Sequence, residues 1–223
     1  MTERAKASPP TAGLRATWGH NWVRIGLWLV SATMAYNTVE GVLALWAGVR
    51  ADSIALVGFG LDSFIECAAA AVLLWRLGVE ARGAAPATVE TSERRVHRFV
   101  GATFLALALY VLAQGSLALW WREAPEETVF GIVLAAVSLV VMPLVSWGKL
   151  HAADHIGSAA LRSEAKETLA CSYLSLTLLV GLAANAVAGW WWADPVAALL
   201  MMPWLVKEGM EGLRGESCCE HGA

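Results

Sequence analysis

The chain contains two long stretches without any charged side chain, residues 100–121 and 128–147. Each has about 20 residues, the number that an α-helix needs to cross the hydrocarbon core of a bilayer. Of the whole chain, 57% is hydrophobic and only 16% is charged, whereas soluble domains have about 45–50% and about 25%. A soluble domain would lack the polar residues to cover its surface. The sequence therefore predicts an integral membrane protein.

The same properties exclude other classes of protein. The net charge is only −3 and apolar runs dominate. We therefore expect that the chain as a whole is neither disordered nor a coiled coil, and that it does not bind nucleic acid. The opening residues contain Pro9-Pro10 and no apolar run before Val23, unlike a signal peptide. Residues 1–21 are predicted to be a disordered cytoplasmic arm.

The apolar pattern predicts an all-α fold with six transmembrane helices. Asp194-Pro195 is typical of a helix start and begins the last and shortest one. Tryptophans lie near most of the predicted ends, where aromatic rings favour the membrane interface. The predicted spans are residues 25–47, 53–75, 100–121, 128–147, 167–188 and 191–206.

Positive charges predict the orientation of these helices. If the N-terminus is cytoplasmic, 14 of the 16 Lys and Arg residues lie inside and only Arg50 and Arg122 lie outside, as the positive-inside rule requires. Both termini are therefore expected in the cytoplasm. We divide the chain into the arm, a transport domain over residues 22–209 with a flexible cytoplasmic loop at 76–98, and a short cytoplasmic tail at 210–223.

Acidic residues occur inside some of these spans, where each costs roughly 2.5–3.5 kcal/mol to insert. The third and fourth spans have none, so we expect them to act as a scaffold while spans one, two and five line a pathway. Intramembrane ionisable groups are functional candidates by default. The acidic residues within the spans or at the start of the fifth are Glu40, Asp62, Glu66, Glu164 and Glu167.

Spacing selects four of the candidates as metal ligands. Asp62 and Glu66 are four residues apart, as are Glu167 and Cys171, and side chains at this spacing project from one face of a helix. Two facing helices with two ligands each would surround one tetrahedral divalent cation.

Simpler roles remain open for each residue taken alone. A lone buried carboxyl group could be a protonated packing residue, Glu167 could be an interfacial helix-end glutamate, and Cys171 could pack as a small apolar side chain. Glu40 could face the same cavity as Asp62 or form a polar contact between helices.

Three segments together resemble the cation diffusion facilitator transporters. Residues 53–66 resemble that family's S-x-A-L-x-A-D-A-x-H/D-S-x-x-D motif, and Asn37 precedes Ser53 by sixteen residues, as the family's first-helix asparagine does. Residues 160–171 resemble A-L-R-A-D-A-x-H-T-x-x-D, and residues 189–200 resemble G-W-x-x-x-D-P-x-A-A-L-x.

The resemblance implies a six-helix fold with a metal site of two residues on helix two and two on helix five, here Asp62, Glu66, Glu167 and Cys171. It also implies export of divalent metals in exchange for protons by a homodimer. The usual helix-five pair is His and Asp, whereas this chain has Glu and Cys, and Phe59 replaces a further aspartate. The family's cytoplasmic C-terminal domain is not expected here, so a dimer would form through the membrane helices.

The ligand set mixes carboxylates with one thiol. Carboxylates suit Mn²⁺ or Fe²⁺, while a thiolate favours Zn²⁺, Cd²⁺ or Co²⁺. We expect Zn²⁺ as the transported substrate and no prosthetic group, in the cytoplasmic membrane of a prokaryote. Transport of another cation, or metal binding by a non-transporting scaffold or sensor, are the alternatives. An intramembrane enzyme is disfavoured because no span carries a protease-like constellation.

Two further groups of residues could bind metal. His151 and His155 are four residues apart in the predicted loop after the fourth span, with Asp154 between them. The predicted tail contains a flexible cluster that could capture soft metal ions, namely Cys218, Cys219 and His221. Solvated histidines and an unstructured tail are the simpler interpretations.

Overall fold

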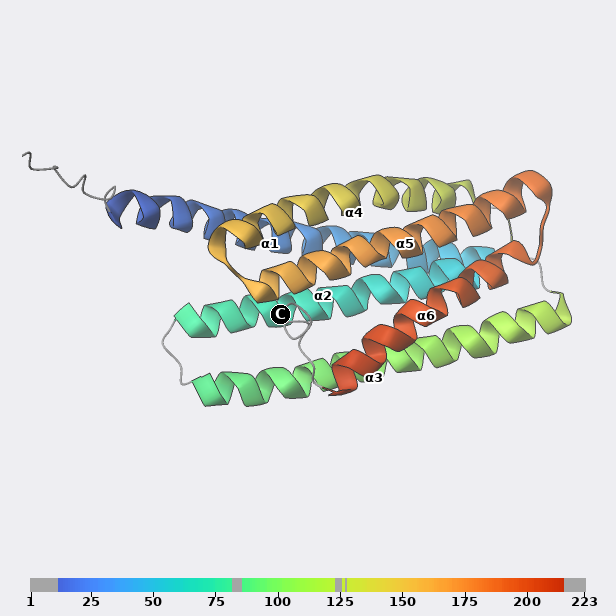
Figure 1. Ribbon diagram of the computed structural model, residues 1–223. Helices are drawn as coiled ribbons and strands as arrows, with labels where there is room; N and C mark the ends of the chain where they lie inside the picture. Colours follow the sequence, from blue (N-terminus) through green and yellow to red (C-terminus); the bar gives the residue numbers. More distant parts are fainter. Residues whose placement is uncertain (1–11, 82–85, 123–125, 127, 215–223) are drawn as a thin grey trace, which may run out of the picture.

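The computed structural model describes residues 12–81, 86–122, 126 and 128–214 and shows a bundle of helices (Figure 1). The all-α prediction is confirmed, since these residues form six helices and no strand. They are α1 (Ala12–Ala51), α2 (Ile54–Ala81), α3 (Pro86–Trp121), α4 (Val129–Ile156), α5 (Ala159–Ala188) and α6 (Ala193–Arg214).

The helices alternate in direction along the bundle (Figure 1). Helices α1, α2, α4 and α5 pack together, while α3 and α6 pair with each other along the side where α2 lies. The α3–α6 pair is very close, because a Cβ at Gly101 would lie 2.8 Å from the carbonyl oxygen of Gly209. Larger side chains at these two glycines would push the helices apart.

Four helices contain segments that are long and apolar enough to cross a membrane, namely Ile54–Trp75, Arg98–Trp121, Val129–Ile156 and Glu164–Ala188. The helix α1 carries Asn37 and Glu40 and α6 carries Asp194, Lys207 and Glu208, which lower their apolar character. Both helices nevertheless run alongside the other four (Figure 1).

The helices extend further than the sequence predicted. The expected loop at 76–98 is largely helical, because α2 continues to Ala81 and α3 begins at Pro86, where proline favours the first turn of a helix. The expected arm at 1–21 overlaps α1 from Ala12 onward, and the tail at 210–223 overlaps α6 up to Arg214. The apolar pattern predicts only the uncharged middle parts of these helices.

A tight turn joins α4 to α5. Gly157, with φ of 67°, ends α4, and Ser158 caps α5 by accepting a hydrogen bond from the backbone N–H of Leu161. Glycine adopts this left-handed conformation without strain. The turn brings the end of α4 directly beside the start of α5.

Candidate metal centre

Three of the four predicted ligands meet in the bundle. One ligand atom each from Asp62, Glu66 and Cys171 lies within 4.8 Å of the other two. The first two come from neighbouring turns of α2 and the third from α5. These three residues lie on the helix faces that the spacing argument selects.

The three side chains differ in exposure. Asp62 is 2% exposed and Cys171 is 1% exposed, while Glu66 is partly buried. The Oδ1 atom of Asp62 has no hydrogen-bond partner among the described residues. A buried acceptor normally has a partner, and a bound cation would provide one.

The helix α1 contributes a hydrogen bond to this group. The side-chain nitrogen of Asn37 donates to Oε2 of Glu66 at 2.7 Å, and Asn37 is 3% exposed. Partners of this kind orient metal ligands and are important for affinity. Asn37 thus contacts a predicted ligand and is not one of the three clustered residues.

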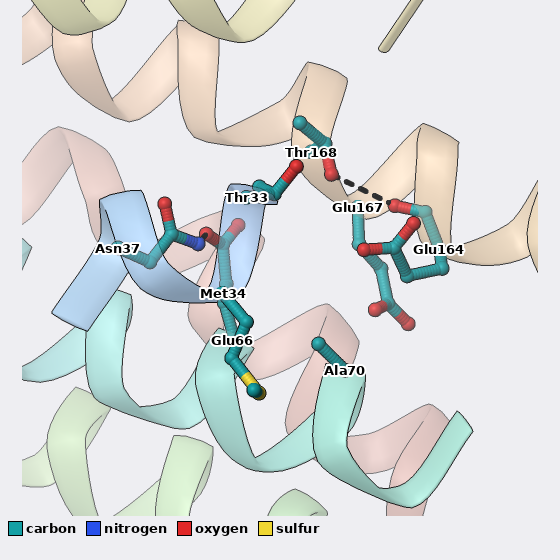
Figure 2. Close-up of a pocket in the computed structure, with 8 residues that line it drawn as sticks. All are labelled: Thr33, Met34, Asn37, Glu66, Ala70, Glu164, Glu167 and Thr168. Atoms are coloured by element: carbon teal, nitrogen blue, oxygen red, sulfur yellow. Dashed lines mark hydrogen bonds between the residues drawn. The ribbon is translucent and has the colours of Figure 1, made fainter. Parts of the chain in front are cut away.

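Glu167 lies apart from the other three predicted ligands. It lines a small polar cavity together with Asn37, Glu66 and Glu164, and Figure 2 shows its carboxyl group turned away from those of Glu66 and Glu164. Its charge still interacts with that of Asp62. In this arrangement Glu167 does not join the cluster of Asp62, Glu66 and Cys171.

Glu40 is buried on α1 and makes polar contacts of its own. Its Oε1 accepts a hydrogen bond from the Tyr36 hydroxyl at 3.2 Å, and its Oε2 accepts one from Ser63 at 3.3 Å. Its charge also interacts with those of Asp62 and Glu66. Glu40 therefore contacts α2 near the site, and it supplies no ligand atom to the cluster.

Glu164 forms a buried ion pair that the sequence did not reveal. The Lys149 ammonium group, which is 0% exposed, donates to Oε1 of Glu164 at 2.7 Å and to the Thr168 hydroxyl at 2.9 Å. The positive-inside rule predicts that Lys149 lies at the cytoplasmic surface, just outside the fourth span. Lys149 is instead buried in the last eight residues of α4, which precede the turn to α5.

Glu208 on α6 is the other charged residue that the sequence analysis missed. Its charge interacts with those of Asp62 and Glu167. It follows Met201 and Leu205 on the buried face of α6, and this helical spacing was the signal that could have identified it.

The secondary metal candidates lie elsewhere. His151 and His155 are exposed on the last turns of α4 and not in a loop. Their rings pack against Trp22, at centroid distances of 5.2 and 4.2 Å, and Asp154 between them pairs with Arg162. The tail candidates Cys218, Cys219 and His221 lie outside the described residues.

Comparison with known proteins agrees with this architecture. Residues 30–214 match the sequence profile of the cation efflux transmembrane domain. An uncharacterized transporter of Synechocystis sp. is 27% identical over 160 residues, which make up 70% of this chain and 52% of that protein. The chain thus spans about half the length of this curated relative. With helices that are long and apolar enough to cross a membrane and a family match over most of its length, the chain is an integral membrane protein that belongs to the cation efflux family.

Proposed function

We propose that the protein exports divalent transition-metal ions from the cytoplasm, with Zn²⁺ preferred, in exchange for protons. The observation that carries this proposal is the meeting of Asp62, Glu66 and Cys171 within 4.8 Å. Two carboxyl groups and a thiol in one buried place form a ligand set that suits such an ion.

Glu167 is proposed as the fourth ligand. It lies one helical turn before Cys171 on α5, and a glutamate side chain is long enough to swing toward a cation held by the other three. A change in the Glu167 rotamer would complete the tetrahedral set of four ligands that Zn²⁺ favours in structural sites.

The thiol decides the expected metal preference. Carboxylates alone would favour hard ions such as Mn²⁺, whereas a thiolate ligand favours Zn²⁺, Cd²⁺ or Co²⁺. Cys171 is almost completely buried beside the two carboxyl groups. We therefore expect transport of Zn²⁺ and Cd²⁺ to exceed that of Mn²⁺ and Fe²⁺.

Proton exchange follows from the chemistry of the ligands. Carboxylates and thiolates bind a metal in their deprotonated form, so metal binding releases protons and protons expel the metal. Protons and metal ions therefore compete for the same buried side chains. Alternating exposure of the site to the two sides of the membrane would couple the two fluxes.

The remaining parts of the proposal concern the setting of the site. The distribution of Lys and Arg supports cytoplasmic N- and C-terminal ends. The family resemblance supports a homodimer, which would form through the membrane helices, and we expect the cytoplasmic membrane of a prokaryote as the location.

A flux assay in proteoliposomes tests the function. The purified chain is reconstituted, and uptake of Zn²⁺, Cd²⁺, Co²⁺, Mn²⁺ and Fe²⁺ is followed with and without a pH gradient. We expect Zn²⁺ flux that a pH gradient accelerates, and none above background for Asp62→Ala, which should still fold and insert.

Other outcomes would identify other functions. Zn²⁺ binding without flux would indicate a scaffold or sensor, and metal-independent uptake of an organic cation would indicate another substrate. Full metal flux in Asp62→Ala would contradict the assignment of the site.

A further inference from the structure

A small cavity lies beside the cluster of Asp62, Glu66 and Cys171, and most of the residues that line it are polar. Its volume is about 10 Å³, the space that a single water molecule occupies. Figure 2 shows the carboxyl groups of Glu66 and Glu164 on opposite sides of it, contributed by α2 and α5. Its polar lining provides oxygen atoms from three helices, on Thr33, Asn37, Glu66, Glu164, Glu167 and Thr168.

Two of these residues have buried oxygen atoms without a hydrogen-bond partner among the described residues, namely Oδ1 of Asn37 and Oε2 of Glu164. The two residues are 3% and 8% exposed. The large majority of buried side-chain polar atoms in proteins have a partner. Two residues that line one cavity thus carry an unpaired acceptor, which indicates that a positively charged or proton-donating species belongs near them.

The charges around the cavity specify this species further. Glu66, Glu164 and Glu167 line it, and the Lys149 ammonium group is bound to Glu164 and Thr168. When all four groups are ionised, two negative charges remain uncompensated. An uncompensated charge in a buried place is strongly unfavourable, and one divalent cation would neutralise both.

We propose that this cavity is a second cation position, built from oxygen ligands alone, which a divalent metal ion occupies in exchange with the cluster of Asp62, Glu66 and Cys171. The inference rests on the proposed function only in treating that metal as cargo. Because Glu66 belongs to both positions, one ion occupies one position at a time. An ion moves from one to the other by exchanging Cys171 and Asp62 for Glu164 and Asn37.

The ligands predict different affinities for the two positions. Oxygen ligands suit Mn²⁺, Mg²⁺ and Ca²⁺, while the thiol in the cluster favours softer ions. Ions pass through a series of sites when each binds strongly enough to be entered and weakly enough to be left. An oxygen-only position beside a sulfur-containing one meets this requirement for Zn²⁺.

Binding of Mn²⁺ to the purified full chain in micelles tests the second position. The variant Asp62→Asn/Cys171→Ser removes two ligands of the cluster and leaves the cavity intact. Electron paramagnetic resonance, which reports free Mn²⁺, should show one ion bound per chain. Adding Glu164→Gln should weaken this binding at least about tenfold, the loss that follows removal of even an outer partner of a metal ligand.

Two further variants separate a cation site from a purely structural ion pair. Glu211→Gln removes a carboxylate that lies on α6 beside Lys207, and it should leave Mn²⁺ binding unchanged. Lys149→Met/Glu164→Gln, added to Asp62→Asn/Cys171→Ser, removes both charges of the buried pair, so that no ammonium group is left unpaired. It should fold and yet bind Mn²⁺ at least about tenfold more weakly than Asp62→Asn/Cys171→Ser. Unchanged Mn²⁺ affinity after this addition would overturn the proposal, as would the absence of Mn²⁺ binding from Asp62→Asn/Cys171→Ser.

The outcome is independent of the transport assay. If the wild-type chain carries no metal flux but Mn²⁺ binding depends on Glu164, the oxygen site stands and the proposed function fails. If Zn²⁺ flux is observed but Mn²⁺ binding does not depend on Glu164, the function stands and the second position is wrong.

Discussion

The side-chain amide of Asn37 on α1 donates a 2.7 Å hydrogen bond to Oε2 of Glu66 on α2. This contact leaves the other oxygen of Glu66 available to the cluster with Asp62 and Cys171. Through this bond α1, which supplies no ligand to the cluster, helps to orient the Glu66 side chain. The hydrogen bond therefore predicts that Asn37 affects metal affinity without touching the metal in the cluster.

Replacing Asn37 by alanine should weaken metal binding. We expect Asn37→Ala to raise the Zn²⁺ concentration for half-maximal flux by about 10- to 100-fold, as loss of such partners does in other metal sites, with a smaller effect on the maximal rate. The matched control is Ser31→Ala, which removes an exposed hydroxyl group bound to Leu27 on the same helix. Equal half-maximal concentrations in the two variants would contradict a role in orienting Glu66.

Replacing Cys171 by serine should change which metal is carried. The hydroxyl group keeps the size of the ligand and removes its softness, so the ratio of Cd²⁺ to Mn²⁺ transport should fall by about tenfold or more. Initial rates in proteoliposomes with each ion alone measure this ratio.

The second described cysteine provides the control for that experiment. Cys67 follows Glu66 on α2, but its thiol contacts Thr38 and donates to the carbonyl oxygen of Met34, both at 3.4 Å. Cys67→Ser should leave the ratio of Cd²⁺ to Mn²⁺ unchanged. A similar change in both variants would exclude Cys171 as the selective ligand.

The sequence predicted the helix faces of the site because two simple rules act on them. Asp62 and Glu66 are costly within a membrane, and their spacing, like that of Cys171 from Glu167, follows the helical period. The direction of the Glu167 carboxyl group depends on side-chain rotamers and on neighbours in other helices. No periodicity in the sequence carries this information.

Lys149 and Glu208 escaped prediction for a related reason. Both lie just beyond the apolar stretches that define the predicted spans, where charged residues normally face water. The structure buries Lys149 because the turn at Gly157 places α5 against it. It leaves Glu208 half-buried because α6 packs against α2, α3 and α5. Tertiary packing decided both positions.

The start of α6 stabilises the start of α2, and this contact predicts a loss of stability. The Asp194 carboxylate accepts hydrogen bonds from the Ser53 hydroxyl and from the backbone N–H groups of Ile54 and Ala55. It therefore acts as a helix cap supplied by another helix. Asp194→Ala should lower the free energy of unfolding by about 1–2 kcal/mol, near the upper range for caps.

Unfolding of the purified chain in micelles measures this effect. Asp154→Ala serves as the control because it removes an exposed carboxylate paired with Arg162, and such surface pairs contribute about 0–1 kcal/mol. Asp194→Asn keeps an acceptor oxygen and should lie between the wild type and Asp194→Ala. If Asp194→Ala is no less stable than Asp154→Ala, the cap does not support α2.

Glu208 predicts how metal affinity changes with pH. It lies two residues beyond the last predicted span, and burial, together with the charge of Glu211, raises the pKa of Glu208 to about 7, against the opposing effect of Lys207. A carboxyl group with this pKa is neutral below pH 7 and negatively charged above it. The charged groups that face it from other helices are Asp62 and Glu167.

Ionised Glu208 should therefore attract a cation to the site only at the higher pH. A unit charge within about 10 Å of a divalent ion contributes on the order of 1 kcal/mol where water screens part of the field. Glu208→Gln should raise the half-maximal Zn²⁺ concentration several-fold at pH 8 and leave it unchanged at pH 6. Zn²⁺ titrations of flux at both values, with Asp154→Asn at an exposed carboxylate paired with Arg162 as control, measure this difference. An equal change at the two pH values would show that ionisation of Glu208 does not assist the metal.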